Sequence, residues 1–593
     1  MERLTRKNVA VDETWDLSDL FAMHAQWEAE LSAIERDLSS VTVYKGRLSE
    51  GASTLAACLD AQERMHTRLT RVTAYASMRL ATDTTDTQSQ ADSTQASTLG
   101  ARVGTALSFI RSEIGRISLD TLAQWMDACS ALAAHRYLLD DLARMRPFTL
   151  SPETEHALSM LRETLAAPHR IYSLGKGADI KFTPAKDAQG NLHAVYDGGP
   201  LIAADPVLRR AAHASFGAGL AAHRNTFAAT FATEVQNNVA LAQVRGYPST
   251  TAMLLHPHKV TQEVYDAVLD VIFTEVAPHM RRFQRLRQRL LGLDHMLYCD
   301  LTAPVPEGSV VSFAQAQAWI LEALSVLGEE YHAIIRDAFA KRWIDRADNA
   351  GKRNGAFCNT VYGVHAYVFM TWADQMRPVF TLAHELGHAG HLMLAGRYQR
   401  HNHARPTTSF IEAPSTMNEL LLAQYLLGRS HDKAMRTSVL LGLMGTYHHN
   451  FVNHLLEGQL QRRIYHMAEK RIPITEKVLT ESKGDILSTF WEDTVTIDET
   501  ARLLWMRQQH YYMGLYPYTY ALGLSISTAA AKAISEEGQP AIDRWLSVLK
   551  AGGTRSPVEL AAMAGVDITD PATFKTAADY VGSLVDELER SVQ

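Results

Sequence analysis

The sequence lacks a long apolar run. No stretch of the 593 residues approaches the ~18–20 consecutive apolar residues that a membrane span needs, and the longest candidates, such as ELLLAQYLLG, are interrupted by polar side chains. The first twenty residues, MERLTRKNVAVDETWDLSDL, mix both charge signs and contain no apolar core of a secretory signal. We therefore expect no membrane association and no signal-dependent export.

Paired cysteines and net positive charge are also missing. The four cysteines, Cys58, Cys129, Cys299 and Cys358, lie far apart and form no CxxC pair, as expected for free thiols in a reducing compartment. We therefore predict a cytoplasmic protein. The formal net charge of −7 provides no basic stripe that could follow a phosphate backbone, so no nucleic-acid partner is expected.

Helical patterns dominate what is present. Apolar residues recur at three- and four-residue spacing over 15–175, from 207 to about 290, and over 313–341. Alternating residues around Gln189-Gly190-Asn191 predict a small hairpin between the first two helical regions. We predict a mostly α fold with a domain boundary near residue 200, which separates a helical N-terminal domain, 1–200, from a second domain, 201–593.

A strand-rich stretch leads into one unusual helix. Residues 355–372, GAFCNTVYGVHAYVFMTW, combine β-branched and aromatic residues with glycines, which predicts short strands. Residues 381–396, TLAHELGHAGHLMLAG, follow. At 100° per residue, an apolar face formed by Leu382, Leu386, Ala389 and Met393 lies opposite a face formed by His384, His388 and His391. One face should pack in the core, and the other should bind a ligand.

The polar face contains the pattern H-E-x-x-H. His384 and His388, four residues apart, can direct ring nitrogens at one metal ion, and Glu385 is placed to act on a water molecule as a general base. His391 lies ~10.5 Å along the helix axis from His384, too far for both to bind one ion. The alternative is an amphipathic helix whose histidines face solvent or hydrogen-bond partners in the core.

The third metal ligand must come from another segment. The residues after the second histidine do not fit the metzincin pattern. The segment SFIEAPSTMNELLLAQYLL places Glu412 and Glu419 seven residues apart, on one face of a helix. We predict Glu412 as the third ligand and Glu419 as a hydrogen-bond partner of a ligating histidine. For both residues, a solvated helix charge is the alternative.

These motifs together resemble a known family. FTLAHELGHAGH and IEAPSTMNE, preceded by GKRNGAFC and followed by QQHYYMGLYPYTYALG, resemble the M3 family of zinc metallopeptidases, most closely its oligoendopeptidase F branch, which is thimet oligopeptidase-like. TWDLSDLF and YCDLTAPV extend the resemblance over most of the chain. It implies a helical ellipsoid of the zincin type with a gluzincin site, a small β-sheet next to the H-E-x-x-H helix, and a deep channel for oligopeptides. Residues 201–593 would then form the zinc metallopeptidase catalytic domain.

The resemblance also assigns residues. It matches His384, His388 and Glu412 to the ligands of one zinc ion and Glu385 to the general base. It implies that a histidine and tyrosines near the C-terminus reach the scissile carbonyl, in the order of preference His510, Tyr516 and Tyr520. The sequence departs from the family pattern at Gln509, where proline is common, and at Pro517. The tyrosines of LYPYTY also alternate as they would on a half-buried strand.

The segment HAYVFMTW resembles the family's edge strand, to which an extended peptide adds through main-chain hydrogen bonds. We accordingly predict that His365, Tyr367 and Tyr518 bind substrate, although HAYVFMTW would serve equally as a core strand. The remaining histidine pairs have no partner at metal-site spacing and are interpreted as structural or exposed; they are His256 with His258, and His448 with His449.

The sequence therefore predicts a zinc-dependent endopeptidase that hydrolyses internal bonds of short oligopeptides with a metal-activated water and Glu385 as general base. Two alternatives stay open. One is a metallocarboxypeptidase with the same H-E-x-x-H site, and the other is a non-catalytic helical protein that binds peptides without cutting them. The sequence leaves the oligomeric state open, as a monomer or a homodimer.

Overall fold

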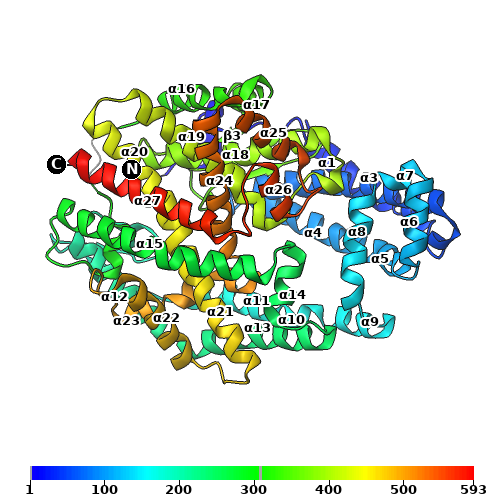
Figure 1. Ribbon diagram of the computed structural model, residues 1–593, viewed down its shortest axis with the longest axis horizontal. Coiled ribbons are helices and arrows are strands. Elements are labelled where there is room, and N and C mark those ends of the chain that lie inside the picture. The colour runs from blue at the N-terminus through cyan, green and yellow to red at the C-terminus, as the bar shows by residue number, and fades with distance from the viewer. Residues whose placement is uncertain (1–2, 306–309, 593) are drawn as a thin grey trace. The chain divides into compact units, whose positions relative to one another are not determined.

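The computed structural model describes residues 3–305 and 310–592, and most of them are helical (Figure 1). Contacts divide the chain into two compact units. Unit 1 comprises Met1–Pro152, Val311–Pro406 and Ile542–Arg555, and unit 2 comprises Glu153–Val310, Thr407–Ala541 and Ser556–Gln593. The predicted boundary near residue 200 falls inside a stretch of unit 2, and the division into domains 1–200 and 201–593 stays a prediction.

Unit 1 holds the helical N-terminal region and the H-E-x-x-H helix. Trp15, from the early TWDLSDLF segment, packs on the small sheet, with its ring centroid 5.6 Å from Phe369 and 6.1 Å from Tyr367. The helices of unit 1 are α1 (His24–Arg36), α2 (Ser39–Thr42), α3 (Ala52–Thr82), α4 (Thr87–Leu107), α5 (Phe109–Ile114), α6 (Leu119–Ala128), α7 (Ser130–Ala133), α8 (Arg136–Met145), α16 (Phe313–Leu324), α17 (Gly328–Ala340), α18 (Met376–Tyr398) and most of α25 (Gln539–Ala551).

The sheet of unit 1 has the order β3-β5-β4, formed by β3 (Ile344–Asp345), β4 (Phe357–Thr360) and β5 (Ala366–Phe369). Strand β5 runs parallel to β3 and antiparallel to β4. Both β4 and β5 pack against α18, which confirms the predicted strands and their place beside this helix. The prediction that HAYVFMTW forms an edge strand is wrong, because β5 is hydrogen-bonded on both sides. Among the described residues, β3 and β4 each have a partner on one side alone, so β4 is one of the two edge strands.

Unit 2 contains the predicted hairpin and the remaining helices. In the hairpin, β1 (Ala185–Lys186) pairs antiparallel with β2 (Leu192–His193). The helices are α9 (Pro152–Met160), α10 (Arg162–Leu165), α11 (Ala167–Leu174), α12 (Pro206–Ala221), α13 (Arg224–Arg245), α14 (Thr250–Leu255), α15 (Gln262–Leu290), α19 (Thr408–Arg429), α20 (Lys433–His448), α21 (Leu455–Glu469), α22 (Glu476–Trp491), α23 (Glu499–Leu503), α24 (Tyr518–Glu537), α26 (Pro557–Met563) and α27 (Pro571–Val592).

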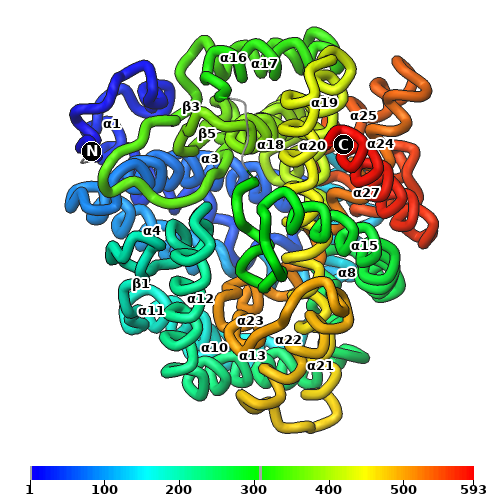
Figure 2. Tube along the Cα trace, turned by 90° about the vertical axis from the view of Figure 1, so that its left-hand side faces the viewer, coloured from blue at the N-terminus to red at the C-terminus, as the bar shows by residue number. Residues whose placement is uncertain are grey.

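The helices around α19 form the framework of unit 2. Figure 2 shows α19 and α20 side by side with the C-terminal helix α27 next to them, and α27 also packs along α15. Asp300, from the YCDLTAPV motif, is fully buried and accepts hydrogen bonds from Arg209 and Arg210, so this motif has a structural role. Across 3–305 and 310–592, none of the helices combines the length and apolarity that a bilayer crossing requires.

Candidate active site

Helix α18 has the predicted apolar face in the core, but His391, which the sequence placed on the opposite face, is fully buried as well. Leu382, Leu386 and Ala389 are fully buried in the core of unit 1. His384 and His388 are half-buried, and their rings meet edge to face with centroids 5.0 Å apart and planes at 85°. The spacing of four residues therefore brings the two imidazoles together on the side of the helix opposite the core.

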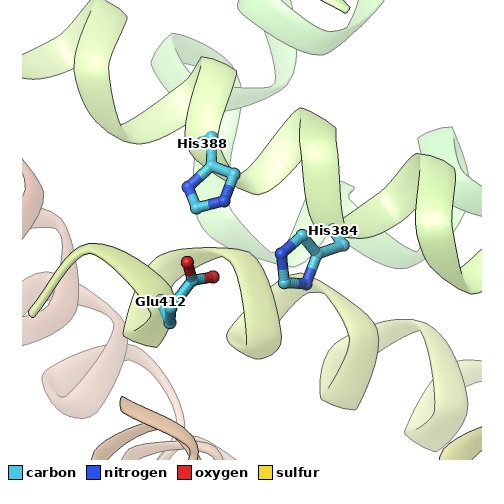
Figure 3. A group of neighbouring side chains, drawn as sticks. All are labelled: His384, His388 and Glu412. Atoms are coloured by element: carbon cyan, nitrogen blue, oxygen red, sulfur yellow. The ribbon is translucent and has the colours of Figure 1, made fainter. Parts of the chain in front are cut away.

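Glu412 joins the two histidines (Figure 3). One ligand atom from each of His384, His388 and Glu412 lies within 4.8 Å of the other two. Figure 3 shows both imidazoles on a single helix and the Glu412 carboxylate on a neighbouring helix, with the three side chains directed toward one another. Glu412 follows His388 by 24 residues, so the group is formed by the fold and not by local spacing alone.

The residues of this group fit a zinc ion. Catalytic zinc sites take three protein ligands, often two histidines and a glutamate, and leave a fourth position for water or substrate. Tetrahedral ligands ~2.1 Å from one ion lie about 3.4 Å apart. Atoms within 4.8 Å of one another therefore need only small side-chain rotations to reach that arrangement.

The first turns of α19 fix Glu412 in place. Its side chain is buried, and the Ser415 hydroxyl lies 3.1 Å from Glu412 Oε2 and 2.9 Å from its main-chain oxygen. The Thr416 hydroxyl donates to the same main-chain oxygen at 2.7 Å. Glu419, two turns further along, is buried and accepts a hydrogen bond from Thr446. Its role as partner of a ligating histidine stays a prediction.

Helix α24 approaches α19 closely at Glu412, the third predicted metal ligand. A Cβ atom added to Gly523 of α24 would lie 2.9 Å from the Glu412 Cβ and 3.1 Å from the Ala413 nitrogen. Contacts under 3.0 Å do not occur between real Cβ atoms, so a larger residue here must displace one of the helices. Glycine at this position therefore helps to set the position of Glu412.

We expect Gly523→Ala to lower the zinc affinity at least ~10-fold, because overpacking costs ~1–3 kcal/mol and pushes Glu412 away from the histidines. Alanine favours the helix by about 1 kcal/mol relative to glycine, but this gain does not return Glu412 to its position beside the histidines. Titration against a competing chelator measures the effect. Gly428→Ala is the matched control, since the position lies in α19 with nothing within 4 Å of the added Cβ. Equal zinc affinity in the two variants would contradict this account.

Glu385 and His391 are both buried on α18. Glu385 is 6% exposed. Burial raises the pKa of the Cys358 thiol in β4, and the negative charge of Glu385 raises it further, which places Glu385 near this edge strand. His391 is fully buried, and burial lowers its pKa to about 3, so it is neutral at ordinary pH. His391 is not part of the metal-binding group.

The C-terminal residues implied by the family resemblance form a cluster in unit 2. Ring centroids are 5.0 Å apart for His510 and Tyr516, 5.4 Å for Tyr516 and Tyr520, and 5.8 Å for His510 and Tyr520. The alternative of a half-buried strand is wrong, because α24 begins directly after Pro517, whose φ of −56° suits a helix start. Tyr516 lies just before this helix and Tyr520 in its first turn, and their rings are in contact.

The cluster lies near Glu412. Burial lowers the pKa of His510, and the nearby Glu457 and Glu412 carboxylates partly oppose this shift. Burial also lowers the pKa of His454 well below its usual value, and Glu412 again acts in the opposite direction. The charge of Glu412 thus acts on both imidazoles, which places the cluster near the third predicted metal ligand.

The three residues predicted to bind substrate contact other side chains of the protein. Tyr367 and Tyr518 are fully buried, and the Tyr518 hydroxyl lies 2.9 Å from Ser409 Oγ. His365 is 6% exposed, stacks on Trp343 with centroids 4.3 Å apart, and places Nε2 3.1 Å from Asp19. Contact of these three residues with substrate stays a prediction.

A helix with H-E-x-x-H and a glutamate from the next helix is an arrangement typical of metallopeptidases. The profile of Peptidase family M3 matches residues 202–580, and that of Oligopeptidase F matches residues 113–182. The chain belongs to peptidase family M3.

Known proteins resemble the chain over nearly all of its length. It is 30% identical to Oligopeptidase PepF of Bacillus subtilis (strain 168), over 98% of this chain and 88% of that protein. The crystal structure of oligoendopeptidase-F from Enterococcus faecium has a TM-score of 0.75 and 26% identity, covering 96% of this chain and 99% of the other. A solved structure from Chlamydophila abortus has a TM-score of 0.87 and 23% identity with both chains fully covered, which shows the same fold.

Proposed function

We propose that this chain is a zinc-dependent endopeptidase that hydrolyses internal peptide bonds of short oligopeptides. The observation that carries the proposal is the group of His384, His388 and Glu412, with Glu385 next to the first histidine. Membership of family M3 supports peptides as substrates, and the names oligopeptidase and oligoendopeptidase among similar proteins support short peptides cut internally. We also propose a cytoplasmic location, since all four cysteines are free.

In the proposed reaction, His384, His388 and Glu412 would hold the zinc ion, which supplies positive charge that polarises the scissile carbonyl and makes a nearby water more acidic. Glu385 accepts a proton from the attacking water and then delivers it to the nitrogen of the leaving amine. His510 and the hydroxyls of Tyr516 and Tyr520 donate hydrogen bonds to the carbonyl oxygen as negative charge develops there. A neutral His510, favoured by its lowered pKa, keeps one N–H donor for this purpose.

The peptide backbone would bind at β4. This strand is one edge of the sheet, and Cys358 in it lies near Glu385. An extended peptide that pairs with β4 through main-chain hydrogen bonds would present its carbonyl groups beside the H-E-x-x-H helix. Strand β4 thus takes the role that the sequence assigned to HAYVFMTW.

Tyr520→Phe is expected to lower kcat at least ~10-fold and to change KM less than ~3-fold, because the lost hydroxyl acts on charge that develops after substrate binds. Steady-state hydrolysis of a fluorogenic oligopeptide measures both constants. Tyr398→Phe is the control, since this exposed tyrosine donates its hydroxyl to Glu330. A Tyr520→Phe enzyme with unchanged kcat would remove Tyr520 from the proposed mechanism.

Product analysis separates the proposed function from its two alternatives. Purified protein is incubated with quenched fluorescent oligopeptides and with a denatured large protein, and the products are identified by mass spectrometry. Internal fragments from the short peptides alone are expected. Release of single C-terminal residues would identify a metallocarboxypeptidase, and bound but uncut peptide would identify a peptide-binding protein.

A further inference from the structure

A second pair of histidines lies against Tyr520. The Nε2 atoms of His449 and His454 are 3.2 Å apart, within hydrogen-bonding distance. The His454 ring stacks on the Tyr520 ring, with centroids 3.9 Å apart and planes at 13°, and His449 meets Tyr520 edge-on at 5.7 Å. The ring centroid of His454 also lies 5.1 Å from that of His510. One buried imidazole thus touches two of the groups that are proposed to act on the substrate carbonyl.

The local backbone creates this pair. Residues His449–His454 form a π-helical turn, η11, between α20 and α21. In an α-helix, residues five apart point about 140° away from each other, at 100° per residue. The i→i+5 hydrogen bonds of a π turn bring such residues to the same side, and π turns within helices occur frequently at functional sites. In the sequence, His449 has no partner at metal-site spacing and is interpreted as structural or exposed.

Among the described ring contacts of Tyr520, the one with His454 has the shortest centroid distance, and it lies beside a cavity. A cavity of about 420 Å³ in unit 2 is lined in part by His449, His454 and Gln509. His454 itself is 7% exposed, and its Nδ1 has no hydrogen-bond partner among the described residues. Removing the His454 ring would therefore open space beside Tyr520 toward this cavity, and the tyrosine could turn away from its present direction.

We propose that His454, held by its hydrogen bond to His449, is a positioning residue that fixes the direction of the Tyr520 hydroxyl. This rests on the proposed function, in which Tyr520 donates a hydrogen bond to the scissile carbonyl oxygen. A displacement of about 1 Å at such a donor can cost ~10²-fold in rate. The role of His454 is thus to keep the donor in place before the substrate arrives.

A double-mutant cycle tests this role. The constants kcat and KM are measured for His454→Ala, Tyr520→Phe and the double variant, with zinc content and thermal stability determined for each. His454→Ala is expected to lower kcat at least ~10-fold and to keep KM within ~3-fold of wild type. In the Tyr520→Phe background, the same substitution is expected to lower kcat by less than a further ~2-fold. A residue that only stabilises the fold would lower kcat equally in both backgrounds.

Two further variants test whether the flat ring of His454 is what matters. His454→Phe keeps a flat ring against Tyr520 and is expected to recover at least ~3-fold of the kcat that His454→Ala loses, because the stacking contact remains. His454→Leu, which fills part of the space but has no flat ring to stack on Tyr520, replaces alanine in the cycle if His454→Ala does not fold. His448→Phe is the matched control, since His448 is a buried histidine of the same helical run that stacks on Trp491, with centroids 6.2 Å apart.

The outcomes separate this proposal from the proposed function. Two results would overturn the positioning role and leave the peptidase function intact. In one, the losses of kcat in His454→Ala and Tyr520→Phe multiply fully in the double variant. In the other, the kcat of His454→Phe is no higher than that of His454→Ala. An unchanged kcat in Tyr520→Phe would overturn the positioning role as well, since there would be no donor to position. Wild-type protein that cleaves no peptide would overturn both.

Discussion

Glu385→Gln is expected to lower kcat by about 10³–10⁴-fold while the protein keeps its zinc. Glutamine has nearly the same shape as glutamate but cannot accept the proton of the attacking water. Glu385 is not part of the group formed by His384, His388 and Glu412, so its replacement removes no metal ligand. Hydrolysis of a fluorogenic oligopeptide gives kcat, and elemental analysis of the same sample gives the zinc content.

Glu329→Gln provides the control for the loss of one carboxylate charge. Glu329 belongs to unit 1, and its carboxylate accepts hydrogen bonds from Arg336 at the surface. Its kcat is expected within ~2-fold of wild type, as for most surface substitutions. Near-normal hydrolysis by Glu385→Gln with full zinc content would show that another group accepts the proton.

Glu412→Ala is expected to act on the metal itself. Removing one of three ligands should weaken zinc binding at least ~10²-fold, more than the loss of a hydrogen-bond partner of a ligand. Activity should therefore disappear at stoichiometric zinc and return in part when zinc is in excess. Competition with a chromogenic chelator measures the affinity of the variant.

Glu419→Ala is the comparison for Glu412→Ala. It removes a buried glutamate of the same helix that is not in the metal-binding group. If Glu419 orients a ligating histidine, its loss should weaken zinc binding by ~10–100-fold. Wild-type zinc affinity in Glu412→Ala would exclude Glu412 as a ligand.

Local patterns predicted the helices well, because their information lies within a few residues. The spacing of Leu382, Leu386 and Ala389 located α18, and a single face carrying Glu412 and Glu419 located α19. The group of His384, His388 and Glu412 followed from known ligand spacing together with the requirement for a third ligand. Its role in binding zinc stays a prediction, as does the deep channel that the family resemblance implies.

Non-local pairing explains the error in the sheet. The edge position was assigned to HAYVFMTW, but β5 is the middle strand because the two-residue strand β3 pairs with its other side. A strand of two residues leaves no recognisable pattern in the sequence. The four residues of β5, AYVF, are all buried, and such an uninterrupted apolar run is itself typical of a central strand.

Local geometry that departs from the usual periods explains the other differences. Tyr516 and Tyr520 alternate with intervening residues like strand residues, but Pro517 initiates a helix between them. His449 and His454 form a pair only because a π turn changes the spacing of residues that face one another. Neither feature can be recognised from α-helical or β-strand periodicity.

We propose above all that zinc held by His384, His388 and Glu412 supports peptide hydrolysis, with Glu385 as the general base. The most direct test of this proposal is to strip the wild-type protein with a chelator and titrate zinc back, while bound zinc and oligopeptide cleavage are followed in the same sample. We predict no cleavage in the stripped protein and a linear return that reaches its maximum at one zinc ion per chain. Cleavage that persists without metal, or that stays absent with one zinc bound, would contradict the proposal.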